Sequence, residues 1–315
     1  MDAVYTWVDG NDPKHQAKRK AHAQEIFAAE VDKRAALPTR FADAGELWLS
    51  VRLLRQNAPW INTIYLVTDE QQPHWLNIQS AQELGITVVD HKDIFVGHEN
   101  SLPTFNSQTI EALLWKIPNL SEQFIYLNDD FFVLRPVEIG DFFYFGKPTF
   151  RGEWVSRNWF IKKIKKIFNL KREGLVGKRA EIDLLNLKRY FSLAHAPYPL
   201  TKNMLKNSFS SEYELKEHLK HRYRHTRQIW PIGYAANVLF MSGEAQQGPD
   251  DWISIFPAEM TEHDLYQMAG KIKSSSFIRF LCVQSLDMAP AFSHTFLTDM
   301  LESFISREKS ALGKS

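Results

Sequence analysis

The chain has 315 residues, of which 44% are hydrophobic, and its net charge is +1. This length allows a substantial core, in one large α/β unit or two intimate lobes, and the balanced charge gives no global field that would favour nucleic acid. The single cysteine excludes an intramolecular disulfide, and no apolar run reaches the roughly 18 residues needed to span a bilayer. We therefore expect a soluble, cytoplasmic chain.

The first predicted strand covers residues 4–8, where Val, Tyr, Thr and Trp favour β-structure before the turn at residues 9–13. A charged helix of about twenty residues is expected to begin at Pro13, because a proline in the first turn loses no helical hydrogen bond. Trp7 is a candidate for stacking on a base or a sugar, although a large aromatic side chain here is more often part of the core. Gly10 either lets the backbone approach a ligand closely or simply forms the turn.

Further strands at residues 63–68, 86–90 and 123–128 alternate with helices at residues 44–57 and 107–117. Alternation of this kind indicates right-handed βαβ units and a mainly parallel sheet. The prediction is therefore an α/β fold with a mainly parallel, Rossmann-like sheet, helices on both of its faces, and a largely helical C-terminal half.

Polar residues at the edges of these elements are candidates for ligand contacts. His91 follows the strand at residues 86–90, where it could contact a substrate or serve as a hydrogen-bonded structural histidine. Asn106 and Ser107 begin the helix at residues 107–117, whose free N–H groups could face a phosphate. Simple helix capping accounts for these two residues equally well.

An apolar run at residues 124–127 ends abruptly in Asn128, Asp129 and Asp130. Burying a carboxylate is costly unless it is paired, hydrogen-bonded or bound to a metal, so two in succession at a strand end indicate a divalent-cation site facing a phosphate. Ligands of open α/β sheets gather at this end of the strands, which supports the interpretation. On the local pattern alone, an Asp-rich turn between two strands explains the sequence equally well.

Residues 151–180 carry ten Lys and Arg residues against two Glu residues. A partly amphipathic, positively charged helix in this insertion could bind an anionic polymer or an acidic membrane surface, which would place the protein at the inner face of the cell membrane. The simpler interpretation is a solvated helix face. Nucleic acid is the weakest candidate, because no nucleic-acid-binding motif accompanies the charge.

Two long motifs resemble, in the same order, the first two conserved regions of the Stealth family of sugar-1-phosphate transferases. The first motif covers residues 2–13, and the second extends from Gly45 to Val137 and includes the acidic pair. That family takes in bacterial capsule polymerases and, more distantly, the catalytic subunit of the lysosomal-enzyme N-acetylglucosamine-1-phosphotransferase. The resemblance implies a glycosyltransferase A-like fold, with residues 1–150 as the nucleotide-sugar-binding half and residues 151–315 as a helical half that completes one catalytic unit.

The resemblance also implies two catalytic residues in the second half. His195 lies in a His-x-Pro element that looks like the family's third region, and Arg224-His225 aligns with the family's Arg-His pair. Histidine has the unperturbed pKa that suits a general base near neutrality, and the arginine fork suits phosphate oxygens. Taken alone, either residue would more often be structural.

The fourth family region is where this chain departs from the family pattern. A Cys-Leu-Asn-Asp-like element is expected there, and the nearest match has Gln284-Ser285 in place of Asn-Asp, with Asp287 displaced. Either Asp287 substitutes as a further candidate metal ligand, or the role has moved elsewhere.

The resulting hypothesis is a transfer of sugar 1-phosphate from a UDP-sugar, with UDP-N-acetylhexosamine favoured, to a hydroxyl of an oligo- or polysaccharide in capsule or exopolysaccharide synthesis, releasing UMP. Mg²⁺ or Mn²⁺ would be held by Asp129 and Asp130, His195 would be the base, and Arg224 and Asp130 would support the transfer. The predicted substrate-binding residues are Trp7, Asp9, Gly10, His91, Asn106, Ser107 and Asn128. A metal-dependent glycosyltransferase that releases UDP and a non-catalytic carbohydrate-binding relative are the alternatives.

Overall fold

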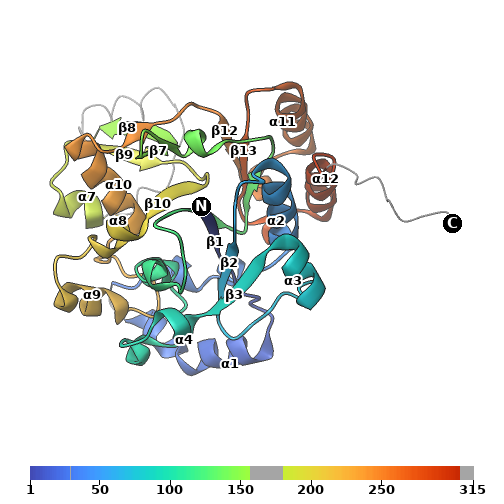
Figure 1. Ribbon diagram of the computed structural model, residues 1–315. Helices are drawn as coiled ribbons and strands as arrows, with labels where there is room; N and C mark the ends of the chain where they lie inside the picture. Colours follow the sequence, from blue (N-terminus) through green and yellow to red (C-terminus); the bar gives the residue numbers. More distant parts are fainter. Residues whose placement is uncertain (29, 157–179, 306–315) are drawn as a thin grey trace, which may run out of the picture.

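The structure is a computed structural model, and it describes residues 1–28, 30–156 and 180–305 (Figure 1). Its central sheet has five strands in the order β10-β4-β1-β2-β3. All neighbours are parallel except β10, which runs antiparallel to β4. The strands are β1 (Asp2–Thr6), β2 (Ile64–Thr68), β3 (Ile86–Asp90), β4 (Gln123–Asn128) and β10 (Tyr198–Thr201). The predicted mainly parallel α/β sheet is therefore confirmed.

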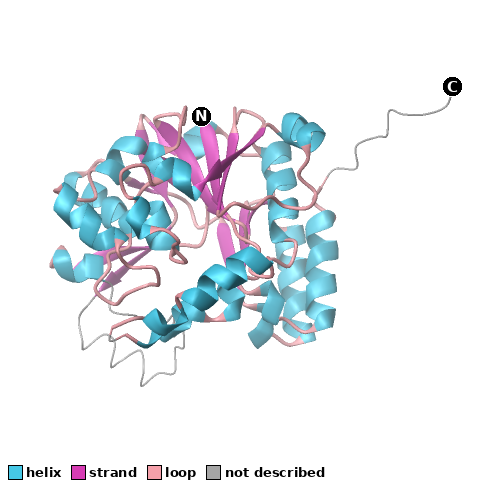
Figure 2. Ribbon diagram, turned by 90° about the horizontal axis from the view of Figure 1, so that it is seen from below, coloured by secondary structure: helices cyan, strands magenta, loops and turns pink. Residues whose placement is uncertain are grey.

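Helices cover both faces of this sheet, as Figure 2 shows. A parallel strand covered on both faces becomes a continuous apolar run, and every residue of β2 is buried. One side carries α2 (Glu46–Asn57) and α3 (Ile78–Leu84), and the other carries α5 (Ser107–Glu111), α8 (Lys202–Lys206) and α10 (Pro231–Ser242). The short α4 (His91–Ile94) follows β3 directly.

Two predicted helices are shorter than expected. The charged helix from Pro13 is α1 (Pro13–Ala21), and a separate 3₁₀ turn follows it. Only His15 of α1 is buried, so the segment has no apolar face that would stabilise a longer helix. The helix expected over residues 107–117 ends at Glu111, because a 3₁₀ turn suffices to bury Leu113 and Leu114. The 3₁₀ turns of this half are η1 (Ala23–Phe27), η2 (Lys33–Ala36), η3 (Pro38–Arg40), η4 (Glu99–Ser101), η5 (Leu114–Lys116) and η6 (Ile139–Asp141).

The C-terminal half contains helices, as predicted, but it also contributes strands. Its helices and 3₁₀ turns are α7 (Ala180–Leu184), α8, α9 (Glu212–Leu219), α10, η7 (Pro257–Glu259), α11 (Glu262–Ser274), η8 (Leu286–Met288) and α12 (Ala291–Glu302). The smaller sheets are β11-β7-β6, β12-β13-β5 and the hairpin β8-β9. Their strands are β5 (Phe131–Val133), β6 (Phe143–Tyr144), β7 (Lys147–Phe150), β8 (Gly152–Ser156), β9 (Arg189–Leu193), β11 (Gln246–Gln247), β12 (Trp252–Ile255) and β13 (Phe280–Val283). Because β13 pairs antiparallel with β5, the far end of the chain lies beside the acidic turn between β4 and β5.

A buried ionic group fastens these smaller sheets together. Asp251, which has no exposed surface, accepts hydrogen bonds from Arg151 Nε at 2.7 Å and from Arg279 Nε at 2.8 Å. The Arg151 guanidinium also lies 4.2 Å from the centre of the Phe280 ring. Loss of one partner would leave a buried charge uncompensated, so this group should act as a fixed joint between β7, β12 and β13.

Most of the predicted basic insertion, at residues 157–179, lies outside the described residues. Within the part of the chain that is described, no helix combines the length and apolarity needed to cross a membrane.

Candidate active site

The register of the parallel sheet brings the predicted site residues to one edge. Thr6 pairs with Val67 on one side and with Asn128 on the other, and Thr68 pairs with Asp90. The residues that follow these positions therefore leave the sheet together, at the end where ligands of open α/β sheets bind.

The two adjacent acids form the tight turn between β4 and β5. The Asp130 backbone oxygen accepts a hydrogen bond from Val283 N at 3.1 Å, and its Oδ2 accepts one from the Cys282 thiol at 3.4 Å. The other carboxylate oxygen, Oδ1, is buried and has no partner. Burial raises the pKa of Asp130 to about 6, and burial together with the Asp130 charge raises the pKa of Asp129 well above its usual range.

A third and a fourth acid face this pair from the start of α2, and the sequence reasoning missed both. Burial raises the pKa of Glu46 to about 7, and the nearby charges of Asp43 and Asp130 raise it further. Glu46 and Asp43 also add to the raised pKa of Asp129. The available signal was an acid at a helix N-terminus, which usually has only a capping role.

The acidic turn fits a divalent cation. The buried Oδ1 of Asp130 has no partner, and a cation could bind it. The neighbouring acids also raise the pKa of Asp129, and a bound positive charge would relieve this repulsion. Among the residues that the structure describes, no three His, Cys, Asp or Glu side chains are arranged to hold a metal ion. This is compatible with Mg²⁺, which commonly takes one or two carboxylates and completes its shell with phosphate oxygens and water.

His195 lies against the first residue after the acidic turn. It is an exposed residue in the connection from β9 to β10. Its ring stands edge-on to that of Phe131, the residue that follows Asp130, with 6.1 Å between the ring centres. The sheet therefore brings together a histidine and two acids that are far apart in the sequence.

Arg224 approaches the same edge from the segment before α10. Its Nη2 donates to the Ser107 hydroxyl at 2.6 Å, which joins two of the predicted residues. Desolvation, followed by the charge of Arg224, lowers the pKa of Arg40 to about 10. Two guanidinium groups therefore lie near one another, an arrangement that suits an anion, and Arg40 was not predicted.

The predicted contacts after β1 are largely engaged within the protein. Trp7 is 6% exposed and packs in the main core. The Asp9 carboxylate accepts a hydrogen bond from Asn11 N at 2.8 Å, and its backbone pairs with the Gln71 side chain. A side chain at Gly10 would collide with the backbone oxygen of Phe41, so the close approach at this glycine is made by the protein's own chain.

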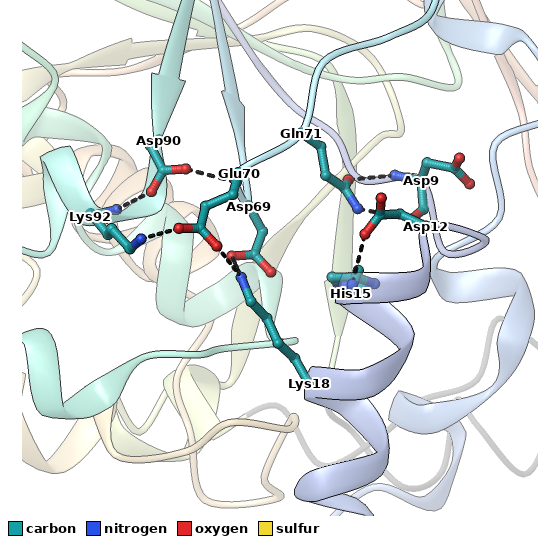
Figure 3. A network of polar contacts seen from close by, with 9 residues as sticks. All are labelled: Asp9, Asp12, His15, Lys18, Asp69, Glu70, Gln71, Asp90 and Lys92. Atoms are coloured by element: carbon teal, nitrogen blue, oxygen red, sulfur yellow. Dashed lines mark hydrogen bonds and ion pairs between the residues drawn. The ribbon is translucent and has the colours of Figure 1, made fainter.

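A polar network fixes α1 across the end of β2 and β3 (Figure 3). Lys18 donates to Asp69 at 2.7 Å and to Glu70 at 2.9 Å, and Lys92 also pairs with Glu70. His91, behind this network, is 2% exposed, and burial lowers its pKa to about 4, so it is neutral at physiological pH. Its buried Nδ1 has no partner, so this nitrogen does not meet the structural alternative of a hydrogen-bonded histidine.

Asn106 has the contacts of a structural residue. It has no exposed surface, and its amide donates to His221 O at 3.0 Å and to Gln228 Oε1 at 2.8 Å. Its oxygen accepts from Gln108 N at 3.1 Å and thereby caps α5. Helix capping therefore explains Asn106. Ser107, in contrast, contacts another predicted site residue, Arg224.

The altered fourth region still borders the acidic turn. Gln284 Nε2 donates to Ser254 Oγ at 2.6 Å, which ties β13 to β12, and Cys282 reaches Asp130. Asp287 is exposed and accepts a hydrogen bond from the Thr39 hydroxyl at 2.7 Å. Asp287 thus contacts η3 and not the acidic pair.

Two family models match the chain: Stealth protein CR1, conserved region 1, over residues 1–21, and Stealth protein CR2, conserved region 2, over residues 40–150. An exopolysaccharide phosphotransferase of Streptomyces coelicolor is 40% identical over 216 residues, which cover 66% of this chain and 21% of that protein. A capsular polysaccharide phosphotransferase of Actinobacillus pleuropneumoniae is 35% identical over 234 residues, which cover 71% and 60% of the two chains. The chain thus spans only part of the length of each relative.

Among solved structures, the galactosyltransferase LgtC in complex with donor and acceptor sugar analogues aligns over 98% of both chains, with 12% identity and a TM-score of 0.42. This similarity is too weak to relate single residues.

Proposed function

Because the chain belongs to the Stealth family, we propose that it transfers a hexose 1-phosphate or N-acetylhexosamine 1-phosphate from a UDP-sugar to a saccharide hydroxyl. The products are UMP and a phosphodiester, and the reaction serves capsule or exopolysaccharide synthesis. One observation carries the proposal: a half-buried acidic pair, an exposed histidine and a hydrogen-bonded arginine gather at the ligand-binding edge of a parallel sheet.

Asp129 and Asp130 would hold Mg²⁺ or Mn²⁺ at this edge. The bound cation would offset the negative charge of the donor diphosphate and of the departing UMP.

His195 removes the proton from the acceptor hydroxyl, and the acceptor oxygen then forms a bond to the sugar-linked phosphorus. The bond from that phosphorus to the bridging oxygen breaks, and UMP leaves with this oxygen. Arg224 compensates the charge on the equatorial phosphate oxygens. The bond between the sugar C1 and its oxygen is untouched, so the anomeric configuration is retained.

Product analysis tests this function. The protein is incubated with UDP-hexoses and UDP-N-acetylhexosamines, a divalent metal and capsule-type oligosaccharides, and the nucleotide released is identified. UMP together with a phosphodiester product is the expected result. Release of UDP would identify a glycosyltransferase instead, and donor binding without any product would identify a non-catalytic relative.

A further inference from the structure

Glu111 is a buried acid that the proposed mechanism does not use, although it lies within the second motif. It ends α5 and is 5% exposed. Its Oε2 accepts a hydrogen bond from Trp230 Nε1 at 2.8 Å, and Trp230 is the residue immediately before α10. A buried carboxylate is costly unless neighbouring donors or positive charges stabilise it, so the contacts of Glu111 indicate its role.

Glu111 also interacts with Ser107, and this contact connects it to Arg224. Ser107 lies one helical turn before Glu111, and its hydroxyl accepts the 2.6 Å hydrogen bond from Arg224 Nη2. A hydroxyl that accepts from a guanidinium still has its own proton to donate. The interaction of Ser107 with the Glu111 carboxylate uses that proton, and the charge of Arg224 acts on Glu111 as well.

A further contact, with Tyr126, connects Glu111 to β4, the strand that ends at the acidic turn. The Tyr126 hydroxyl lies 3.4 Å from Glu111 Oε1, 3.1 Å from Asn128 Oδ1 and 2.8 Å from Thr6 Oγ1. Since this hydroxyl has one proton, it donates to Asn128 or to Glu111, while Thr6 can donate to it. Glu111 is thus connected to the ends of both β1 and β4.

We propose that Glu111 is a positioning residue: through the Ser107 hydroxyl it holds the Arg224 guanidinium at a fixed place relative to Asn128 and the acidic turn. This inference rests on the proposed phosphotransferase function, in which Arg224 faces the transferring phosphate. Burial raises the pKa of Glu111 to about 7, and the positive charge of Arg224 and the hydrogen bond from Trp230 oppose that rise. The same contacts therefore favour the charged form of Glu111 that the positioning role requires.

The test is a double-mutant cycle of Glu111→Gln and Arg224→Ala, measured as kcat and donor KM for the full chain with its divalent metal. Glu111→Gln keeps the shape of the side chain and an acceptor oxygen for Trp230, but it removes the charge behind Ser107. We expect kcat to fall on the order of 10- to 100-fold with little change in donor KM, because the negative charge that Arg224 compensates is redistributed over the equatorial oxygens as the acceptor oxygen attacks. In the Arg224→Ala background, Glu111→Gln should have almost no further effect.

The possible results are distinguishable. Additive losses of kcat in the double mutant would overturn the positioning role while leaving Arg224 in the mechanism. Wild-type turnover of Arg224→Ala would instead overturn the assigned role of Arg224, and the inference would fail with it. Ser107→Ala provides a second route, because it deletes only the linking hydroxyl, and its loss of kcat should likewise vanish in the Arg224→Ala background.

Asn237→Ala is the matched structural control. Asn237 is a buried polar residue of α10 that bonds to the backbone of Phe191, away from Glu111. Its loss should lower the melting temperature and leave kcat unchanged. A fall in kcat equal to that of Glu111→Gln would show that general destabilisation explains both results, which would overturn the inference.

Discussion

The rings of His195 and Phe131 meet edge to face, with ring centres 6.1 Å apart, although the two residues lie far apart in the sequence. Phe131 is fully buried and immediately follows Asp130, so the ring contact places the histidine near the acidic turn. The general base of the proposed reaction is thereby placed against the strand that presents the carboxylates.

Substitution of His195 should affect the chemical step. We expect His195→Ala to lower kcat about 10²- to 10⁴-fold with little change in donor binding, because a general base acts only after both substrates are bound. Steady-state kinetics and donor titration measure the two effects separately. His263→Ala, an exposed histidine of α11, is the control. An unchanged kcat in His195→Ala would leave the residue a structural role only.

Neutralisation of Asp130 should separate activity from stability. We expect Asp130→Asn to lower kcat on the order of 10²- to 10³-fold, the range seen when one preorganised charge is removed from a transition state. In chelator, the same variant should melt at a temperature equal to or above that of the wild type, because a repulsive neighbour of Asp129 is gone. Full wild-type activity in excess chelator would contradict the metal site. Asp287→Asn should leave metal dependence unchanged.

The stability of the metal-free protein should fall as pH rises toward neutrality. Glu111 has a folded-state pKa of about 7, above the value of about 4.3 expected in an unfolded chain. Between these values the folded chain binds the proton more tightly, so the free energy of unfolding decreases with pH, by at most about 4 kcal/mol for this group. Urea titrations in chelator at several pH values measure the slope.

Glu111→Gln should make that slope shallower, whereas Glu259→Gln, at an exposed site, should not. Equal slopes in wild type and Glu111→Gln would mean that Glu111 titrates alike in the folded and unfolded chains.

Replacement of Gly10 should act through packing. A Cβ at this position would collide with the backbone oxygen of Phe41, which cannot move aside as a side-chain end could. We expect Gly10→Ala to destabilise the fold by about 1–3 kcal/mol, the usual cost of overpacking. Gly140→Ala, where the added atom meets nothing within 4 Å, is the control in thermal denaturation. A stable Gly10→Ala protein that no longer binds donor would favour a direct ligand contact instead.

The basic residues at 151–180 lead to a prediction from sequence. If they guide an anionic acceptor, reversal of Lys162, Lys163, Lys165 and Lys166 to Glu should raise the KM for long acceptors and shorten the products, with little change on a minimal acceptor. Kinetics with acceptors of graded length measure this. Loss of binding to anionic vesicles alone would indicate a membrane contact, and no change in either would indicate a solvated helix face.

Three strands of the central sheet were predictable because apolar, β-prone runs leave a strong local signal, whereas β10 (Tyr198–Thr201) was not predicted. The runs that became β2, β3 and β4 are apolar, lie between polar residues, and were placed to within one residue. The lengths of α1 and α5 were not predictable, because tertiary packing and not periodicity decides where a short helix ends.

The site was predictable only in part, and for a similar reason. Asp129 and Asp130 interrupt an apolar run, so their sequence is conspicuous. Glu46 and Glu111 lie within amphipathic helices, where an acid ordinarily marks the solvated face. Only the packing of α2 and α5 against the sheet shows that both are buried, and no local pattern in one sequence contains that information.

The pairing of β13 with β5 has a consequence for biosynthesis. Until residues 280–283 have been made, β5 (Phe131, Phe132 and Val133) lacks β13, its strand partner among the described residues, although the central sheet is already complete. An apolar, unpaired edge strand is a site for association between nascent chains. A chain whose synthesis stops before residue 280 should therefore depend on chaperones to stay soluble. Pairing of β13 with β5 should then cover this edge and complete the surroundings of the acidic turn in one late step.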